Sequence, residues 1–174
     1  MISPQLLPPV SHPAGWASWR EVMDVALRQA HEAGSVGEVP VGAALLSAEG
    51  KLLAQAHNAP LSLNDPTAHA EMLCLRQGAS TLGNYRLTGC ILAVTLEPCI
   101  MCLGAMVHAR IAGLVIGARD PKTGAVLSRL KGLRLPFLNH QFWVLEGIMA
   151  EECGNLLSSF FLRRRKARQD LLSP

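Results

Sequence analysis

Two short motifs hold side chains of the types and spacing that a catalytic metal site needs. Cys99 and Cys102 lie three positions apart directly after Pro98, and His69 stands two positions before Glu71. Zinc binds nitrogen and sulfur tetrahedrally, and a catalytic zinc keeps one of its four positions for water. Cysteines three apart at a helix start point to one face and can share a metal. With the histidine as third ligand, the fourth position stays open.

Glu71 adds a carboxylate that is free of the metal. Because it lies two residues from His69, it can face the water in the open position. Such a water ionises near neutral pH, and a neighbouring carboxylate can take its proton and return it to a leaving amine. This combination fits hydrolytic removal of an amino group from an aromatic ring. The pattern H-x-E…P-C-x-x-C is the known signature of zinc-dependent base deaminases.

Each motif alone has a plainer interpretation. A lone C-x-x-C could be a redox pair or half of a structural zinc site, and a single histidine is more often structural than a ligand. The pattern becomes specific because Pro98 follows a predicted buried strand and His69 begins a predicted helix about thirty residues earlier. We therefore favour a catalytic zinc site.

The elements that must position these residues alternate between helix and strand periodicity. Asp65 and Pro66 predict a helix start, as cap and first helical residue. The alternation predicts an α/β fold with one mixed sheet and helices on both faces. In chain order we expect a helix at 16–34, a hairpin of strands at 41–46 and 52–56, a helix at 65–78, a strand at 90–96, a helix at 98–110, a strand at 114–117, a loop at 120–124, a strand at 142–145 and a helix at 149–168.

Length and composition favour one globular domain. The chain has 174 residues, of which 49% are hydrophobic and 17% charged. We expect a mobile, proline-rich arm at 1–15, a single domain at 16–168 and a C-terminal tail at 169–174. The chain shows neither a membrane-length apolar run nor a basic, apolar secretory start, so a cytoplasmic protein without membrane contact is expected.

The basic residues are concentrated at one place. Five of the 16 lie within residues 163–168, and without them the chain holds 11 basic and 13 acidic residues. Such a cluster can attract phosphates, or it can be a solvated helix end where cations suit the dipole. Charge alone leaves both interpretations open.

The five cysteines do not predict a disulfide framework, since their number is odd and no secretory signal precedes them. Cys74, Cys90 and Cys153 lie in apolar or helical contexts. We expect these three to be small buried hydrophobic residues.

Longer sequence blocks resemble the bacterial-type tRNA-specific adenosine deaminases of the cytidine deaminase superfamily. The likeness runs over roughly residues 19–166 without large insertions. It implies a three-layer α/β/α sandwich with a central mixed five-stranded sheet, a homodimer, one zinc ion per subunit, and conversion of the wobble adenosine of a tRNA anticodon to inosine. By similarity, His69, Cys99 and Cys102 hold the zinc and Glu71 shuttles protons. The blocks are Asn58, residues 65–71, 95–102, 117–120, 151–153 and Phe160-Phe161.

The resemblance also implies contacts with the tRNA anticodon stem-loop. Asn58 would hydrogen-bond the flipped-out nucleoside, although Asn is also common in turns. Asp120 would contact the RNA backbone or ribose; its plainer role is a surface carboxylate offset by Arg119. Aromatic side chains can stack on splayed bases. Phe160, Phe161 and the following basic run, including Arg164, would meet the stem-loop, although one of the two phenylalanines is expected in the core.

Two departures from the family pattern bear on substrate fit. Leu103 stands where the family usually has Ala, and Val126-Leu127 replaces small residues. Two alternatives use the same motif: a zinc deaminase of a free base or nucleoside such as cytosine or guanine, and a non-catalytic RNA-binding subunit with structural zinc. The flanking blocks and basic cluster favour RNA over a free base. Glu71 favours catalysis, because a structural zinc site has no use for an unliganded carboxylate.

Overall fold

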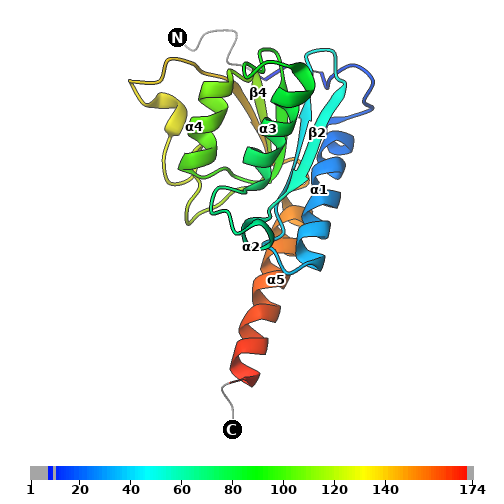
Figure 1. Cartoon of the computed structure of the whole chain (residues 1–174), viewed down its shortest axis with the longest axis vertical. Coiled ribbons are helices and arrows are strands. Elements are labelled where there is room, and N and C mark those ends of the chain that lie inside the picture. The colour runs from blue at the N-terminus through cyan, green and yellow to red at the C-terminus, as the bar shows by residue number, and fades with distance from the viewer. Residues whose placement is uncertain (1–7, 10, 172–174) are drawn as a thin grey trace.

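A mixed five-stranded sheet with the order β2-β1-β3-β4-β5 forms the centre of the fold (Figure 1). The computed structural model describes residues 8–9 and 11–171. The strands are β1 (Gly42–Leu46), β2 (Leu52–His57), β3 (Ile91–Leu96), β4 (Gly113–Ala118) and β5 (Trp143–Glu146). The helices are α1 (Trp19–Ser35), α2 (Pro60–Leu63), α3 (Ala70–Leu82), α4 (Ile100–Ala109), the 3-10 turn η2 (Gly132–Arg134) and α5 (Ala150–Asp170).

The strand directions follow from the connections. A tight turn joins β1 to β2, and β1 runs antiparallel to both β2 and β3. Strands β3, β4 and β5 are parallel. Since α4 connects β3 to β4, the carboxyl ends of these two parallel strands meet at one edge of the sheet.

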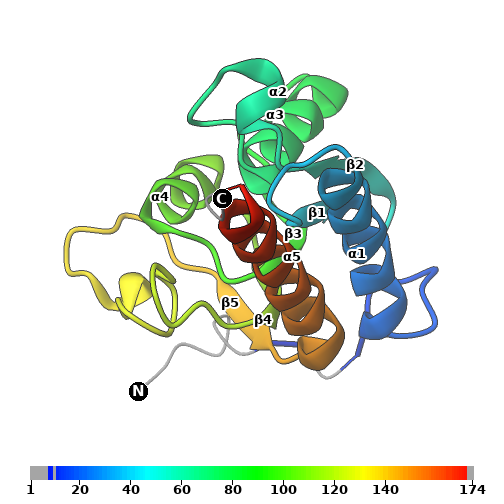
Figure 2. The ribbon, with the colours of Figure 1, turned by 90° about the horizontal axis from the view of Figure 1, so that it is seen from below.

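Helices cover both faces of the sheet, as the alternation of side chains along a strand requires. In β1, Ala43 and Leu45 pack into the core shared with α3 and α4. Ala44 and Leu46 pack into the opposite core, with α1 and the first turn of α5. Figure 2 shows the two helix pairs on opposite sides of the sheet. The predicted three-layer α/β/α sandwich with a mixed five-stranded sheet is confirmed.

The predicted helix start at Asp65 is wrong. Asp65 Oδ1 instead accepts hydrogen bonds from the Thr67 amide (2.8 Å) and hydroxyl (2.7 Å), which closes a turn ahead of the helix. Helix α3 begins only at Ala70. Because the side-chain oxygen serves this local turn, residues 65–69 stay outside the helix, and the extended His69 lies at the helix terminus.

Helix α3 also ends later than predicted, and Gly78 is not its stop. A Cβ on Gly78 would lie 2.1 Å from Leu45 Cδ2, so this glycine lets α3 approach β1 closely. The helix ends at Gly83, whose φ of 63° is left-handed. In β4, Gly113 has a similar role: a Cβ there would lie 2.1 Å from the Trp143 indole.

Smaller differences concern the ends of elements and the loops. Helix α1 begins at Trp19, capped by the Ser18 side chain, rather than near residue 16. The short elements α2 and η2 were not predicted. Residues 1–7 and 10 of the predicted arm and 172–174 of the predicted tail lie outside the described residues, and the limits of the domain stay a prediction. Within the described part of the chain, no helix has the length and apolar character needed to cross a membrane.

Candidate active site

Two helix N-termini bring the three predicted metal ligands together. His69 is the residue that caps α3, and Cys99 caps α4, both with extended backbone. Cys102 follows in the first turn of α4 and is buried. Neither cap uses its side chain for a hydrogen bond to the helix, so both side chains are available as ligands.

The ligand atoms have the spacing of a tetrahedral zinc site. His69 Nδ1 lies 3.7 Å from Cys99 Sγ and 3.6 Å from Cys102 Sγ, and the two sulfur atoms are 3.8 Å apart. Zinc bond lengths imply separations of about 3.8 Å between two sulfurs and about 3.5 Å between nitrogen and sulfur. The residues therefore fit a zinc ion, and among the described residues they form the one such His/Cys/Asp/Glu group.

The local electrostatics suit a metal and a proton carrier. The hydrogen bond with Cys102 lowers the pKa of the Cys99 thiol, which favours the thiolate form that a metal needs. Glu71, in the first turn of α3, is only 3% exposed. Burial raises the pKa of its carboxyl, which makes its carboxylate a stronger base.

Asn58 follows β2 and supports the same helix terminus. Its Oδ1 accepts a hydrogen bond from the Ala70 amide at 2.8 Å, which satisfies a free N–H at the start of α3. The side chain is buried and lines the pocket beside the ligand group. Asn58 therefore helps to hold His69 in place as well as forming part of the pocket.

A pocket of about 700 Å³ extends from the ligand group to α5. Its lining includes His69, Glu71 and Cys99 of the ligand region and Phe161 and Arg165 of α5. The remaining lining comes from the segment before β1, from residues 58–60, from the ends of β3 and β4 with the residues that follow them, and from earlier turns of α5. These residues are Val39, Val41, Asn58, Pro60, Leu96, Glu97, Ala118, Arg119, Asp120, Pro121, Lys122, Thr123, Gly154, Leu157 and Ser158.

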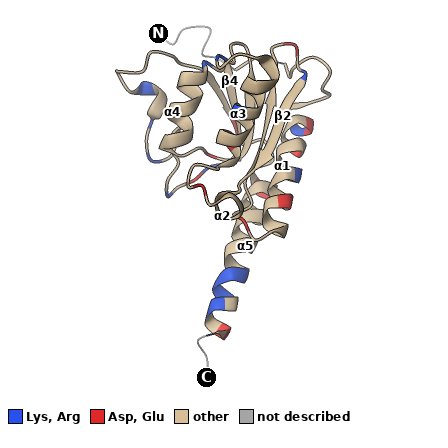
Figure 3. Ribbon diagram, in the orientation of Figure 1, with Lys and Arg blue, Asp and Glu red and all other residues tan. Residues whose placement is uncertain are grey.

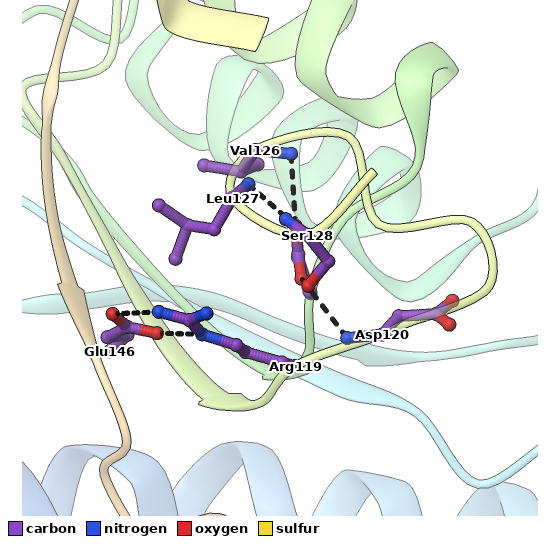
Figure 4. A network of polar contacts seen from close by, with 7 residues as sticks. Arg119, Asp120, Val126, Leu127, Ser128 and Glu146 are labelled. Carbon is purple, nitrogen blue, oxygen red and sulfur yellow. Dashed lines mark hydrogen bonds and ion pairs between the residues drawn. The ribbon is translucent and has the colours of Figure 1, made fainter. Parts of the chain in front are cut away.

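Asp120 lies in the pocket wall after β4, and its carboxylate shapes the loop. Its Oδ1 accepts hydrogen bonds from the amides of Lys122 (2.8 Å) and Thr123 (3.2 Å). Hydrogen bonds to Thr123 and Lys122 outweigh the effect of burial and lower the pKa of Asp120. Arg119 does not offset this charge as expected, since its guanidinium forms a two-pronged pair with Glu146 (Figure 4).

Glu97 is a pocket residue that the motif search did not single out. It follows directly after β3, before Pro98, and is 3% exposed. Its Oε1 accepts from the amides of three consecutive residues and its Oε2 from the amide of Asp120 and the hydroxyl of Ser128. Figure 4 labels the residues that provide these donors. Burial raises the pKa of Glu97, but these hydrogen bonds outweigh it and lower the pKa. A carboxylate at the end of a buried strand was the available sequence signal.

Helix α5 carries the predicted RNA-binding residues on different faces. Phe160 is 5% exposed and lies in the protein interior, as expected for one of the pair, while Phe161 is 40% exposed and lines the pocket. The Arg164 guanidinium lies over the Phe160 ring at 5.7 Å rather than in the pocket. Arg165 lines the pocket instead. Its helical spacing from Gly154, Leu157, Ser158 and Phe161 was a signal that the sequence interpretation did not use.

The end of α5 projects beyond the rest of the domain (Figure 1). Residues 161–171 are all exposed, and the basic cluster lies on this projecting part (Figure 3). Arg165 belongs both to this cluster and to the pocket lining.

The two departures from the family pattern do not reach the pocket lining. Leu103 is 1% exposed and packs against Gly132, where a Cβ would lie 2.1 Å from Leu103 Cδ2. Val126 is 3% exposed, and the amides of Val126 and Leu127 bind Glu97. The extra bulk is thus taken up away from the pocket. Cys74, Cys90 and Cys153 are buried free cysteines, as expected.

Comparisons with known proteins agree with this site. The model of the cytidine and deoxycytidylate deaminase zinc-binding region matches residues 17–118. A tRNA-specific adenosine deaminase of Haemophilus influenzae is 45% identical over 149 residues, 86% of each chain. One of Bacillus subtilis is 43% identical over 84% of this chain and 91% of that protein.

A solved structure from studies of A-to-I editing by tRNA:A34 deaminases at the wobble position of transfer RNA superimposes with a TM-score of 0.76. Its sequence is 43% identical, and the match covers 78% of this chain and 98% of that one. The fold is therefore shared with a protein similar along most of this chain, and all three ligand residues lie within the matched zinc-binding region.

Proposed function

The chain belongs to the zinc-binding cytidine and deoxycytidylate deaminases, among the tRNA-specific adenosine deaminases, and on this premise we propose that it converts the wobble adenosine of a tRNA anticodon to inosine. The reaction consumes water and releases ammonia from C6 of the adenine. The observation that carries the proposal is the pocket, which runs from the ligand group to Phe161 and Arg165 at the start of the basic cluster. Such a pocket suits one nucleoside that belongs to a longer RNA.

The residues of the site divide the chemical work. His69, Cys99 and Cys102 would hold a zinc ion, which when bound would lower the pKa of a water to about 7. Glu71 takes the proton of the attacking water, because its buried carboxylate is a strengthened base. The same carboxyl then donates to the leaving amine, which departs as ammonia, and Glu71 returns to its ionised form.

Other residues bind and orient the RNA. Asn58 donates from its amide nitrogen, since its oxygen is already held by Ala70. Asp120 contacts the ribose or backbone beside the target, and Phe161 packs against a neighbouring base at the pocket opening. Arg165 pairs with a phosphate there, while Phe160 supports the helix from the interior. Arg164 contacts the stem-loop outside the pocket.

We also propose one zinc ion per subunit, a homodimer and a cytoplasmic location, where tRNA is found. The outer face of α4 supports the dimer, because it has no Asp, Glu, Lys or Arg and Ile100 on it is 59% exposed. Half-buried Met101, Gly104 and Ala105 continue this face. Replacing Ile100 by Asp is expected to yield monomers in light scattering; an unchanged dimer would place the interface elsewhere.

The function is tested with unmodified tRNA whose anticodon begins with adenosine. Sequencing after incubation should give an A-to-G change at that position alone, and Glu71→Gln should abolish it. The same protein is incubated with adenine, guanine, cytosine and their nucleosides. Deamination of a free base with every tRNA unchanged would contradict the RNA substrate, and turnover of neither would favour a structural zinc site.

A further inference from the structure

Glu97 is a buried carboxylate whose hydrogen-bond partners all belong to one loop. Oε1 accepts from the amides of Val126 (3.2 Å), Leu127 (2.7 Å) and Ser128 (2.9 Å). Oε2 accepts from the Asp120 amide (3.1 Å) and the Ser128 hydroxyl. Four backbone N–H groups and one hydroxyl thus surround a side chain that is 3% exposed. Hydrogen bonds to a carboxylate are stronger than those between neutral groups.

The loop held in this way forms one wall of the pocket. Asp120, Pro121, Lys122 and Thr123 all line it. The loop folds tightly onto its anchor: a Cβ on Gly124 would lie 2.4 Å from Glu97 Cδ. The Ala125 amide also donates to the Pro98 carbonyl at 2.9 Å.

The anchor and the metal ligands share a short stretch of chain. Glu97 and Pro98 directly precede Cys99, whose sulfur belongs to the ligand group. The pocket wall is therefore tied by hydrogen bonds to the residues that place this ligand. A rigid connection of this kind sets the distance between the reacting centre and the groups that hold the substrate.

We propose that Glu97 is a positioning residue that fixes the pocket wall at 120–123 relative to Cys99 and so determines how tightly the target nucleoside is held. The inference rests on the proposed function, because it takes the pocket as the nucleoside site. Glu97 does not touch the reacting atoms in this role. It acts through Asp120, and its loss weakens substrate binding more than it slows the chemical step.

Glu97→Gln is a selective probe of this role. An amide has one acceptor oxygen and one NH₂ donor, so the donors that bind one of the two carboxylate oxygens lose their acceptor. The NH₂ is better tolerated at the Oε2 position, because the Ser128 hydroxyl can rotate and accept from it. The Asp120 amide then faces a donor and loses its partner. The substitution should release Asp120 while the amides of 126–128 keep theirs.

The first measurement is steady-state deamination of the anticodon tRNA by the zinc-loaded protein. Glu97→Gln should raise KM at least about fivefold, the effect of one lost hydrogen bond, with kcat within about twofold of wild type. Glu146→Gln is the matched control: this carboxylate binds the same segment through the exposed Arg119 pair and should change KM less than about twofold. Equal effects of both substitutions, or a fall in kcat with lost zinc in Glu97→Gln, would overturn the proposal.

The second measurement is amide hydrogen exchange without substrate. In Glu97→Gln the Asp120 amide should exchange at least about tenfold faster, and those of Leu127 and Ser128 should change little. If Glu97→Gln does not fold, Ser128→Ala is measured in its place, and it should also raise KM. Unchanged exchange at Asp120 would refute the anchor. If wild-type protein leaves tRNA unmodified, the proposed function fails, but exchange still decides whether Glu97 holds Asp120.

Discussion

Apart from Arg164, which lies over the Phe160 ring, the projecting end of α5 carries four cations that fall into two pairs by helix geometry. Successive residues are rotated by about 100°. Arg165 is therefore rotated by about 40° from the pocket residue Phe161. Arg168 is close to two full turns further along the helix than Phe161, so it points in nearly the same direction. Arg163 and Lys166 lie about 140–200° away, on the other side of the helix. All four are exposed, so orientation is what distinguishes the pairs.

This geometry predicts different salt dependence for two double variants of equal charge. For single-stranded nucleic acid, each phosphate contact contributes about 0.7 to the slope of log affinity against log salt. Replacing Arg165 and Arg168 by Ala should make the slope less steep by ~1.4. Between ~50 and ~200 mM salt, the affinity of this variant should therefore fall about sevenfold less than that of the wild type. Replacing Arg163 and Lys166 by Ala should leave the slope within about 0.3 of wild type.

The assay is binding of a labelled anticodon stem-loop to the catalytically silent Glu71→Gln protein across a salt series. Circular dichroism and zinc content of each variant serve as controls for folding. Equal slope changes in the two double variants would show that the cations act through total charge rather than by facing the pocket. An unchanged slope after loss of Arg165 and Arg168 would remove this face of α5 from the RNA contact.

Three further predictions concern catalysis, metal and packing. Glu71→Gln should keep the zinc, measured by metal analysis, and lower kcat by at least ~10²-fold, since it removes the proton carrier; turnover near wild type would exclude Glu71 from the mechanism. Cys99→Ser should lower the zinc content well below one per chain, and full occupancy would contradict the ligand assignment. Gly113→Ala should destabilise the fold by ~1–3 kcal/mol, because the new methyl group would meet Trp143. Gly34 lies in α1, and its new methyl group would make only an ordinary contact with Pro40, so Gly34→Ala should raise Tm slightly; equal Tm values for the two variants would refute the packing argument.

The sequence predicts the metal site well because its information is local. His69 and Glu71 lie two residues apart, and Cys99 and Cys102 lie three residues apart within one helical turn, so spacing alone orients them. The sheet and its layers were equally accessible, since strand β3 is a continuous buried run and α1 has a clear helical period. Local signals were enough for both.

The remaining features depend on contacts between distant residues. The role of Glu97 emerges only when the chain returns at 120–128. The late start of α3 depends on a competition at Asp65, where a side-chain turn replaces the helix cap that the same residue could form. Likewise, Phe160 and Phe161 are indistinguishable in the sequence, and the packing of α5 against the sheet decides which one is buried.

The hydrogen bond between Ala70 and Asn58 also restricts what the pocket can recognise. With Oδ1 facing an N–H, the side-chain amide cannot be flipped without opposing two donors. The NH₂ group is therefore the half of the side chain that is left for a ligand in the pocket, and within residues 8–9 and 11–171 it has no hydrogen-bond acceptor of its own. Under the proposed function, Asn58 would thus test the nucleobase for a lone pair: a ring nitrogen that is free would satisfy it, whereas the same nitrogen carrying a proton or a methyl group would be rejected. A single backbone contact at a helix terminus would in this way set a chemical selection rule.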